Sequence, residues 1–291
     1  TSLPGPAHCG DLGSYAFRFI DFINKTGFSV WQILPVGPTQ FDGSPYQSSS
    51  VHAGNPRLIN VGELADKSLL PAELAQKQRI TDSEKKQLLI RAWKTFQSKP
   101  SQEMRTGLDH FITENASWLE NYTLFRALRE ENRNQCWWDW PTPIRDREPA
   151  AIEKAKHRLE SSLDYIRFEQ FQFFRQWMKL KRYANERGVL LFGDMPIFVA
   201  HDSAEVWAHR DVFELDAEGH PLVVAGVPPD YFSATGQRWG NPLYRWDRLE
   251  RDGFSFWVER MKTQLQLFDL IRVDHFRGFE AYWEIPFGNE T

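Results

Sequence analysis

The sequence has little of what marks a secreted, membrane or nucleic-acid-binding protein. Its 291 residues include only two cysteines, Cys9 and Cys136, too few for a disulfide framework in a chain this long. The longest apolar runs, such as residues 189–192, are far too short to span a bilayer. The net charge of −4 gives no electrostatic reason to bind nucleic acid or an anionic membrane. We therefore expect a cytoplasmic protein with two inert thiols.

Other absences exclude further classes. The opening stretch TSLPGPAHCGDLG lacks the basic start and apolar core of a signal peptide, and without an initiator Met we expect the true N-terminus to lie upstream. No Gly-rich loop of the P-loop or dinucleotide type occurs, which argues against a phosphate- or nucleotide-using enzyme. His201 and Asp202 could begin a metal site, but no third ligand follows at a recognisable spacing. We expect neither metal nor cofactor.

Aromatic residues, in contrast, are abundant. The chain has 12 Trp, 22 Phe and 8 Tyr, which together make up 14% of its residues. Tryptophan suits half-buried surfaces, because it combines a flat apolar face with a single N–H donor. Such faces can stack on the C–H faces of sugar rings, although an aromatic-rich core would explain most of these residues equally well.

The periodicity of the chain predicts alternating helices and buried strands. Helices are expected at 14–26, 163–187 and 255–266, and strands at 29–34, 189–194 and 268–273. Strands joined by helices or long loops indicate a parallel sheet, and therefore an α/β fold. Long loops rich in Gly, Pro and aromatic residues follow two of the strands, and such loops are usually functional.

The chain divides into three segments by composition. Residues 1–62 and 164–291 carry the predicted strands, whereas residues 63–163 are charged and amphipathic without strands. We interpret 63–163 as a helical insertion subdomain, and the flanking segments as two parts of one catalytic barrel. A (β/α)₈ barrel fits because its active site lies where strands end, and two predicted strands end in the acids Asp194 and Asp274.

The stretch LFDLIRVDHFRGFEAYW contains the most informative cluster. Side chains alternate along a strand, so Arg272 and Asp274 point to the same side. A neighbouring guanidinium would lower the pKa of the Asp274 carboxyl, as the nucleophile of a glycosidase requires. A salt bridge that only orders the top of the barrel accounts for the spacing equally well.

Four long motifs resemble one family. They are LPVGPTQFDGSPYQSSSVHAGNPRLI, GDMPIFVAHDSAEVW, VAGVPPDYFSATGQRWGNPLY and LIRVDHFRGFEAYW, and in this order they resemble amylomaltase, the bacterial 4-α-glucanotransferase. The similarity runs from residue 2 to the C-terminus and is weakest in the helical insertion. It implies a (β/α)₈ barrel that cleaves α-1,4-glucans and transfers the glucanosyl unit to an acceptor sugar, through a covalent glycosyl-enzyme.

The resemblance also implies residue roles. Asp274 matches the nucleophile, and Arg272 matches the residue that orients and ionises it. Asp194 matches an acid that binds the sugar at the cleavage point, and Tyr46 matches an aromatic platform beneath that sugar.

Further positions match the covering and hydroxyl-binding parts of the family site. Trp239, Asp230 and Phe232 match the segment that covers the acceptor side. Ser44 and Gln237 are weaker candidates for contacts with sugar hydroxyls. We assign no catalytic role to His275 or Arg277, which we expect to brace the end of the strand.

The resemblance places two further acids beyond Thr291. Retaining glycosidases need a second carboxyl group as acid and base, and in the family this Glu and a third acid lie on later strands. The three predicted strands also fill only part of a barrel. We therefore expect the chain to be the N-terminal portion of a longer enzyme.

Two alternatives remain open at this stage. One is an α-glucan hydrolase, which differs from a transferase in whether water or a sugar accepts the glucanosyl unit. The other, for these residues alone, is a maltooligosaccharide-binding protein without turnover. The expected ligands are maltooligosaccharides and α-1,4-glucans in each case, and the sequence predicts no oligomeric state.

Overall fold

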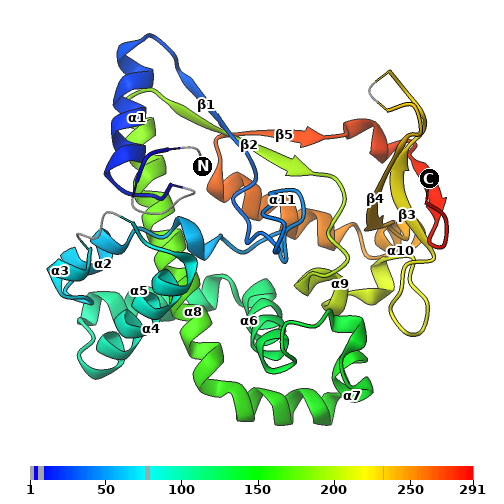
Figure 1. The fold of residues 1–291 in the computed structure, drawn as a ribbon, viewed down its shortest axis with the longest axis horizontal. Coiled ribbons are helices and arrows are strands. Elements are labelled where there is room, and N and C mark those ends of the chain that lie inside the picture. The colour runs from blue at the N-terminus through cyan, green and yellow to red at the C-terminus, as the bar shows by residue number, and fades with distance from the viewer. Residues whose placement is uncertain (1–2, 6–9, 76–78, 232, 291) are drawn as a thin grey trace.

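The computed structural model describes residues 3–5, 10–75, 79–231 and 233–290. Its centre is a parallel sheet of three strands in the order β1-β2-β5, which confirms the predicted parallel arrangement (Figure 1). The strands are β1 (Val30–Ile33), β2 (Leu190–Pro196) and β5 (Leu270–Asp274). Their register sets Arg272 opposite Asp194 and Asp274 opposite Pro196, so the polar strand ends meet at one edge.

A second sheet, which the sequence analysis treated as loop, lies beside the C-terminal ends of these strands (Figure 1). It is antiparallel, with the order β4-β3-β6, and consists of β3 (Val223–Val227), β4 (Gln237–Pro242) and β6 (Trp283–Pro286). Glycines in and beside its strands obscure the alternation of apolar and polar residues by which strands are predicted. Gly236, at φ 77°, directly precedes β4, and a Cβ there would approach the Val227 carbonyl oxygen to 2.5 Å.

Helices make up most of the remaining structure; in Figure 1, α1 lies beside β1 at the upper left, and α4, α5, α6 and α7 lie below the parallel sheet. They are α1 (Ser14–Lys25), α2 (Val61–Asp66), α3 (Ala72–Ala75), α4 (Asp82–Ser98), α5 (Gln102–Glu114), α6 (Ala116–Glu131), α7 (Thr142–Arg145), α8 (Pro149–Asn185), α9 (Ala204–Ala208), α10 (Trp246–Arg251) and α11 (Ser255–Leu267), with 3₁₀ turns at Pro56–Leu58, Trp137–Asp139, Arg210–Val212 and Phe276–Phe279.

Helix α8 corrects one prediction. It begins at Pro149 rather than at residue 163, because Pro at the first helical turn starts it earlier than its apolar face indicates. It therefore runs unbroken through the expected end of the insertion at residue 163. Between β1 and β2 the described elements are all helical, as expected. The division at residues 62 and 163 stays a prediction.

Helix α8 ties the helical region to the parallel sheet. It contacts α1, α4, α5, α6 and β2. Near its C-terminal end, buried Trp177 donates its indole N–H to the Leu267 carbonyl at 2.8 Å and packs edge-on against Phe268. Much of the aromatic content is thus core. Among the described residues no helix is both long and apolar enough to cross a membrane.

The loop that follows β1 is held from behind by a buried carboxyl group. Glu205 of α9 accepts hydrogen bonds from the Ser50 hydroxyl at 2.7 Å and from the Val51 amide at 3.2 Å. The Gln170 amide of α8 adds two bonds to the backbone of Gly54, at 2.8 and 2.9 Å. These contacts fix a polar loop whose backbone lacks a sheet partner over most of its length.

We expect Gly193→Ala to destabilise the fold. In β2, a Cβ at position 193 would approach the ring of buried Phe268 to 2.4 Å, so the neighbouring core would have to shift. Such overpacking costs about 1–3 kcal/mol. Urea unfolding midpoints measure the effect, with Gly288→Ala as control because its Cβ would meet nothing within 4 Å. Equal stability of both variants would contradict the packing described for β2.

We also expect Glu205 to make stability fall as pH rises. Burial raises the pKa of Glu205 from its usual 4.5 to about 7, so the folded state favours the protonated carboxyl. This contribution is complete below pH 4.5 and is lost as pH rises through 7, by about 3 kcal/mol in total. The free energy of unfolding of wild type minus that of Glu205→Gln should therefore fall between pH 5 and 8. A flat difference would be inconsistent with the raised pKa.

Candidate active site

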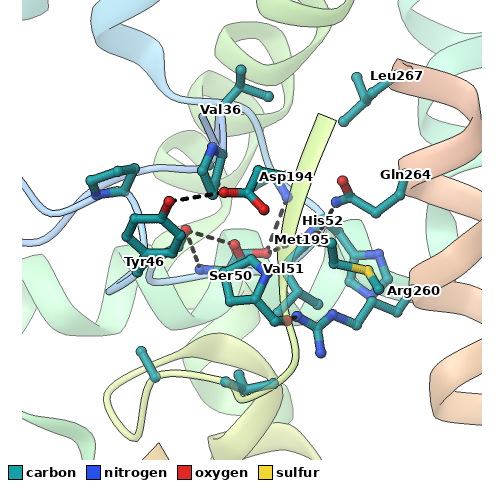
Figure 2. A pocket seen from close by; sticks show the side chains of 18 of the residues that line it. Val36, Tyr46, Ser50, Val51, His52, Asp194, Met195, Arg260, Gln264 and Leu267 are labelled. Atoms are coloured by element: carbon teal, nitrogen blue, oxygen red, sulfur yellow. Dashed lines mark hydrogen bonds between the residues drawn. The ribbon is translucent and has the colours of Figure 1, made fainter. Parts of the chain in front are cut away.

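Four side chains from three parts of the chain form one hydrogen-bonded network at the ends of β2 and β5. The Tyr46 hydroxyl donates to Asp194 Oδ2 at 2.8 Å, as Figure 2 shows. Arg272 donates through Nη1 to Asp194 Oδ1 at 2.6 Å and through Nη2 to Asp274 Oδ1. One guanidinium thus joins the acids that end two neighbouring strands.

The two carboxylates differ in their exposure. The Asp194 side chain is 2% exposed, and both of its oxygens accept hydrogen bonds. The Asp274 side chain is 38% exposed, and it shares only one oxygen with Arg272. Asp194 is therefore a fixed anchor of the network, whereas Asp274 retains an oxygen that can reach a ligand.

The pKa shifts of Arg272 and Tyr46 are consistent with this arrangement. The hydrogen bond and charge of Asp194, with a smaller effect of Asp274, raise the pKa of Arg272. Partial burial and the bond to Asp194 raise the pKa of Tyr46 to about 12, so its hydroxyl remains a donor throughout the neutral range. The network carries two carboxylates and one permanent cation.

An open cavity of about 450 Å³ lies over Asp274. Its walls come from the loop after β1, the end of β2, the antiparallel sheet and the end of β5; the lining residues are Ser44, Tyr46, Gln47, Pro196, Ile197, Phe198, Trp239, Asn241, Asp274 and His275. Among these, Asp274 is the carboxylate. A cavity with one carboxylate, amide and hydroxyl groups, and aromatic rings suits an uncharged polyhydroxylated ligand.

The hairpin of β3 and β4 provides the aromatic cover. Trp239 of β4 meets the ring of His275 edge-on at a centroid distance of 5.1 Å. Its indole N–H donates to Gln237 Oε1 at 3.1 Å, and its carbonyl accepts from Gln47 Nε2 at 3.4 Å. Gln237 therefore lies beside the indole, while Trp239 itself lines the cavity.

Two further predicted site residues, Ser44 and Asp230, lie in loops. Ser44 lines the cavity, and its amide donates to Asp42 Oδ1 at 3.1 Å. Asp230 closes the turn between β3 and β4, where its carboxylate accepts from the Ser233 amide at 2.8 Å. The structure does not place Asp230 among the residues that line the cavity. Phe232 lies outside the described residues.

His275, to which the sequence analysis assigned no catalytic role, also lies at the site. It lines the cavity with its backbone in the left-handed region at φ 53°, so the chain turns sharply after Asp274. Within the described part of the chain, its buried Nε2 has no hydrogen-bond partner. The position of His275 next to Asp274 in the RVDHFRG stretch indicated that it lies near the site. Nothing in the sequence predicts that its backbone adopts the left-handed conformation.

The residues that could have begun a metal site are engaged elsewhere. His201 Nε2 contacts the Gly219 carbonyl at 2.7 Å, and its ring stacks on Trp138 at 4.0 Å between centroids. Asp202 pairs with Arg129 at 2.7 Å. The described residues contain no group of three or more His, Cys, Asp or Glu side chains placed to hold a metal ion.

Comparisons with known proteins agree on one family. The family model described as 4-alpha-glucanotransferase matches residues 1–291. A 4-alpha-glucanotransferase of Thermus thermophilus is 50% identical over 295 residues, which cover 98% of this chain and 58% of the relative. One from Aquifex aeolicus is 43% identical, and the match covers 100% of this chain and 60% of that protein.

A solved structure agrees with these relatives. The amylomaltase of Streptococcus agalactiae in complex with acarbose superposes with a TM-score of 0.93 at 36% identity, and the match covers 100% of this chain and 61% of that one. The chain thus spans about three fifths of the length of these proteins. With a family model matched from end to end, the chain belongs to the 4-alpha-glucanotransferase family.

Proposed function

We propose that this chain carries the nucleophile and donor-sugar side of a 4-α-glucanotransferase site. One observation carries the proposal: the Arg272 guanidinium joins buried Asp194 to accessible Asp274 at the floor of an aromatic-lined cavity. A salt bridge that only ordered the strand ends would not need one carboxylate open to a cavity. The family relationship supplies the reaction type.

We further propose that β1, β2 and β5 belong to a (β/α)₈ barrel. Their parallel order, with acids at the C-terminal edge and helices on the outside, is the arrangement of successive strands in such a barrel. The similarity to the Streptococcus agalactiae amylomaltase supports it. In that setting the antiparallel sheet is a cover built on the loops above the barrel.

The proposed reaction is a double displacement. Asp274 attacks the anomeric carbon, the glycosidic C–O bond breaks, and the leaving 4-oxygen takes a proton from a second carboxyl group. The same group then removes a proton from the 4-hydroxyl of an acceptor sugar, which attacks the anomeric carbon and releases Asp274. Arg272 holds Asp274 in line and Tyr46 binds the sugar undergoing transfer, while Asp194, which is 2% exposed with both oxygens engaged, anchors Tyr46 and Arg272.

Transfer requires that an acceptor sugar reach the glycosyl-enzyme before water. The hairpin residue Trp239 and the neighbouring Phe198 give the cavity an apolar wall on the side of the second sheet. Such a wall favours the flat face of a sugar over water. We propose maltooligosaccharides and α-1,4-glucans as donor and acceptor, consistent with the acarbose bound in the Streptococcus agalactiae relative, and a cytoplasmic location.

We expect Asp274→Asn to abolish transfer. The amide cannot form the glycosyl ester, so in the full-length protein the rate of maltotriose disproportionation should fall at least about 10³-fold. Chromatography of products follows glucose and longer oligosaccharides. Asp247→Asn is the matched control, because Asp247 also pairs with an arginine but lies exposed on α10. Transfer at an undiminished rate would refute the assignment of Asp274.

The products of the wild-type protein separate the alternatives. Glucose together with chains longer than maltotriose indicates transfer. Only shorter sugars would indicate an α-glucan hydrolase, and binding without any product would indicate a binding protein.

We expect Arg272→Lys to reduce kcat by about two orders of magnitude. A lysine ammonium is a point charge, so it cannot extend one arm to Asp194 and the other to Asp274. Loss of this bridge leaves the nucleophile mispositioned, which costs about 10²-fold in rate. Steady-state kinetics with maltotriose measure the effect. A lysine variant with wild-type kcat would show that only the positive charge matters.

A further inference from the structure

A second arginine lies behind the site and has no predicted role. Arg260 of α11 is 2% exposed, and Figure 2 shows its side chain reaching beneath Met195. Its Nη1 donates to the Ile197 carbonyl at 2.8 Å, and its Nη2 donates to the Pro196 carbonyl. The two planar arms of one guanidinium therefore hold two consecutive backbone oxygens.

These two oxygens belong to the segment that joins both halves of the site. Pro196 is the last residue of β2, two positions after Asp194, and its register partner in β5 is Asp274. Pro196 and Ile197 also line the cavity over Asp274. A shift of this backbone would therefore move Asp194 relative to Asp274 and strain the bridge made by Arg272.

Tyr244 completes the contact. Its hydroxyl donates to the Ile197 carbonyl at 2.8 Å and lies 3.1 Å from Arg260 Nη1. The guanidinium also lies 4.9 Å from the centre of the Trp257 ring, which stabilises the cation through its π face. Within the described part of the chain, this cation thus contacts carbonyl dipoles, a hydroxyl and an aromatic ring.

This environment is costly for a cation. Among the described residues no carboxylate lies within ion-pair distance of Arg260, and burial lowers its pKa against the smaller, opposite effects of Tyr244 and Glu205. The arginine offsets this cost by donating to two carbonyl groups that an apolar residue would leave without these donors. A forked donor of this kind is well suited to fixing two consecutive carbonyls at once.

We propose that Arg260 is a positioning residue for the transfer reaction. It fixes the end of β2 on α11, and so sets the separation of Asp194 and Asp274 that Arg272 bridges. Helix α11 leads directly into β5, so the arginine ties the element that carries Asp274 to the strand that carries Asp194. The inference rests on the proposed function, since it concerns the same pair of acids.

Arg260→Met and Arg260→Lys in the full-length protein test it. The contacts with remote parts of the glucan are untouched, so KM for maltotriose should stay within about threefold of the wild-type value. We expect kcat to fall at least about tenfold in Arg260→Met. The fall should be smaller in Arg260→Lys, because lysine keeps one donor. Trp177→Phe is the control. It removes a buried hydrogen bond to Leu267, the last residue of α11, which lies before the N-terminal end of β5 and so away from Asp274. It should lower Tm without lowering kcat. Wild-type kcat in both Arg260 variants would overturn the proposal.

A milder variant covers the case in which Arg260→Met does not fold. Tyr244→Phe removes one hydroxyl from the Ile197 carbonyl and from Arg260, so kcat should fall severalfold with KM preserved; an unchanged kcat overturns the proposal. If the wild-type protein forms no transfer products, the proposed function fails, and this inference fails with it. If it is active but the variants match its kcat, only the positioning role fails.

Discussion

The arrangement of the site depends on one charged bridge. Arg272 lies two residues before Asp274 on β5, and its register partner on β2 is Asp194, so parallel pairing alone brings the three side chains together. The two acids of this bridge have different environments. Buried Asp194 is fixed by Arg272 and Tyr46, whereas accessible Asp274 faces the cavity. The guanidinium lies between the two carboxylates and attracts both, which offsets their mutual repulsion.

The supporting structure behind the bridge is polar rather than apolar. Glu205 holds the loop that carries Tyr46, and Arg260 holds the end of the strand that carries Asp194. Hydrogen bonds are directional, so buried polar contacts of this kind define positions more sharply than apolar packing does. The cost is the desolvation of both side chains, which appears as the raised pKa of Glu205 and the lowered pKa of Arg260.

Much of this site was predictable from the sequence, for physical reasons that also explain what was missed. Alternation along a strand predicted that Arg272 and Asp274 share a face, and the parallel sheet predicted that Asp194 lies nearby. The antiparallel sheet was missed because Gly226 in β3 and Gly240 in β4 interrupt the alternation of its strands. The start of α8 was missed because the part of the helix before residue 163 buries few apolar side chains. Arg260 was missed because a lone arginine on an amphipathic helix looks like a solvated residue, and only tertiary structure shows it buried.

Trapping the glycosyl-enzyme tests the central claim most directly. A 5-fluoro-α-glucosyl fluoride has a leaving group that departs without protonation, while its ring fluorine slows both steps, so the adduct depends on the nucleophile rather than on the acid. Mass spectrometry of the digested protein should find one added fluorohexose on the peptide that contains residues 267–283, at Asp274. An adduct on a different carboxylate, in a protein that turns over maltotriose, would contradict the account.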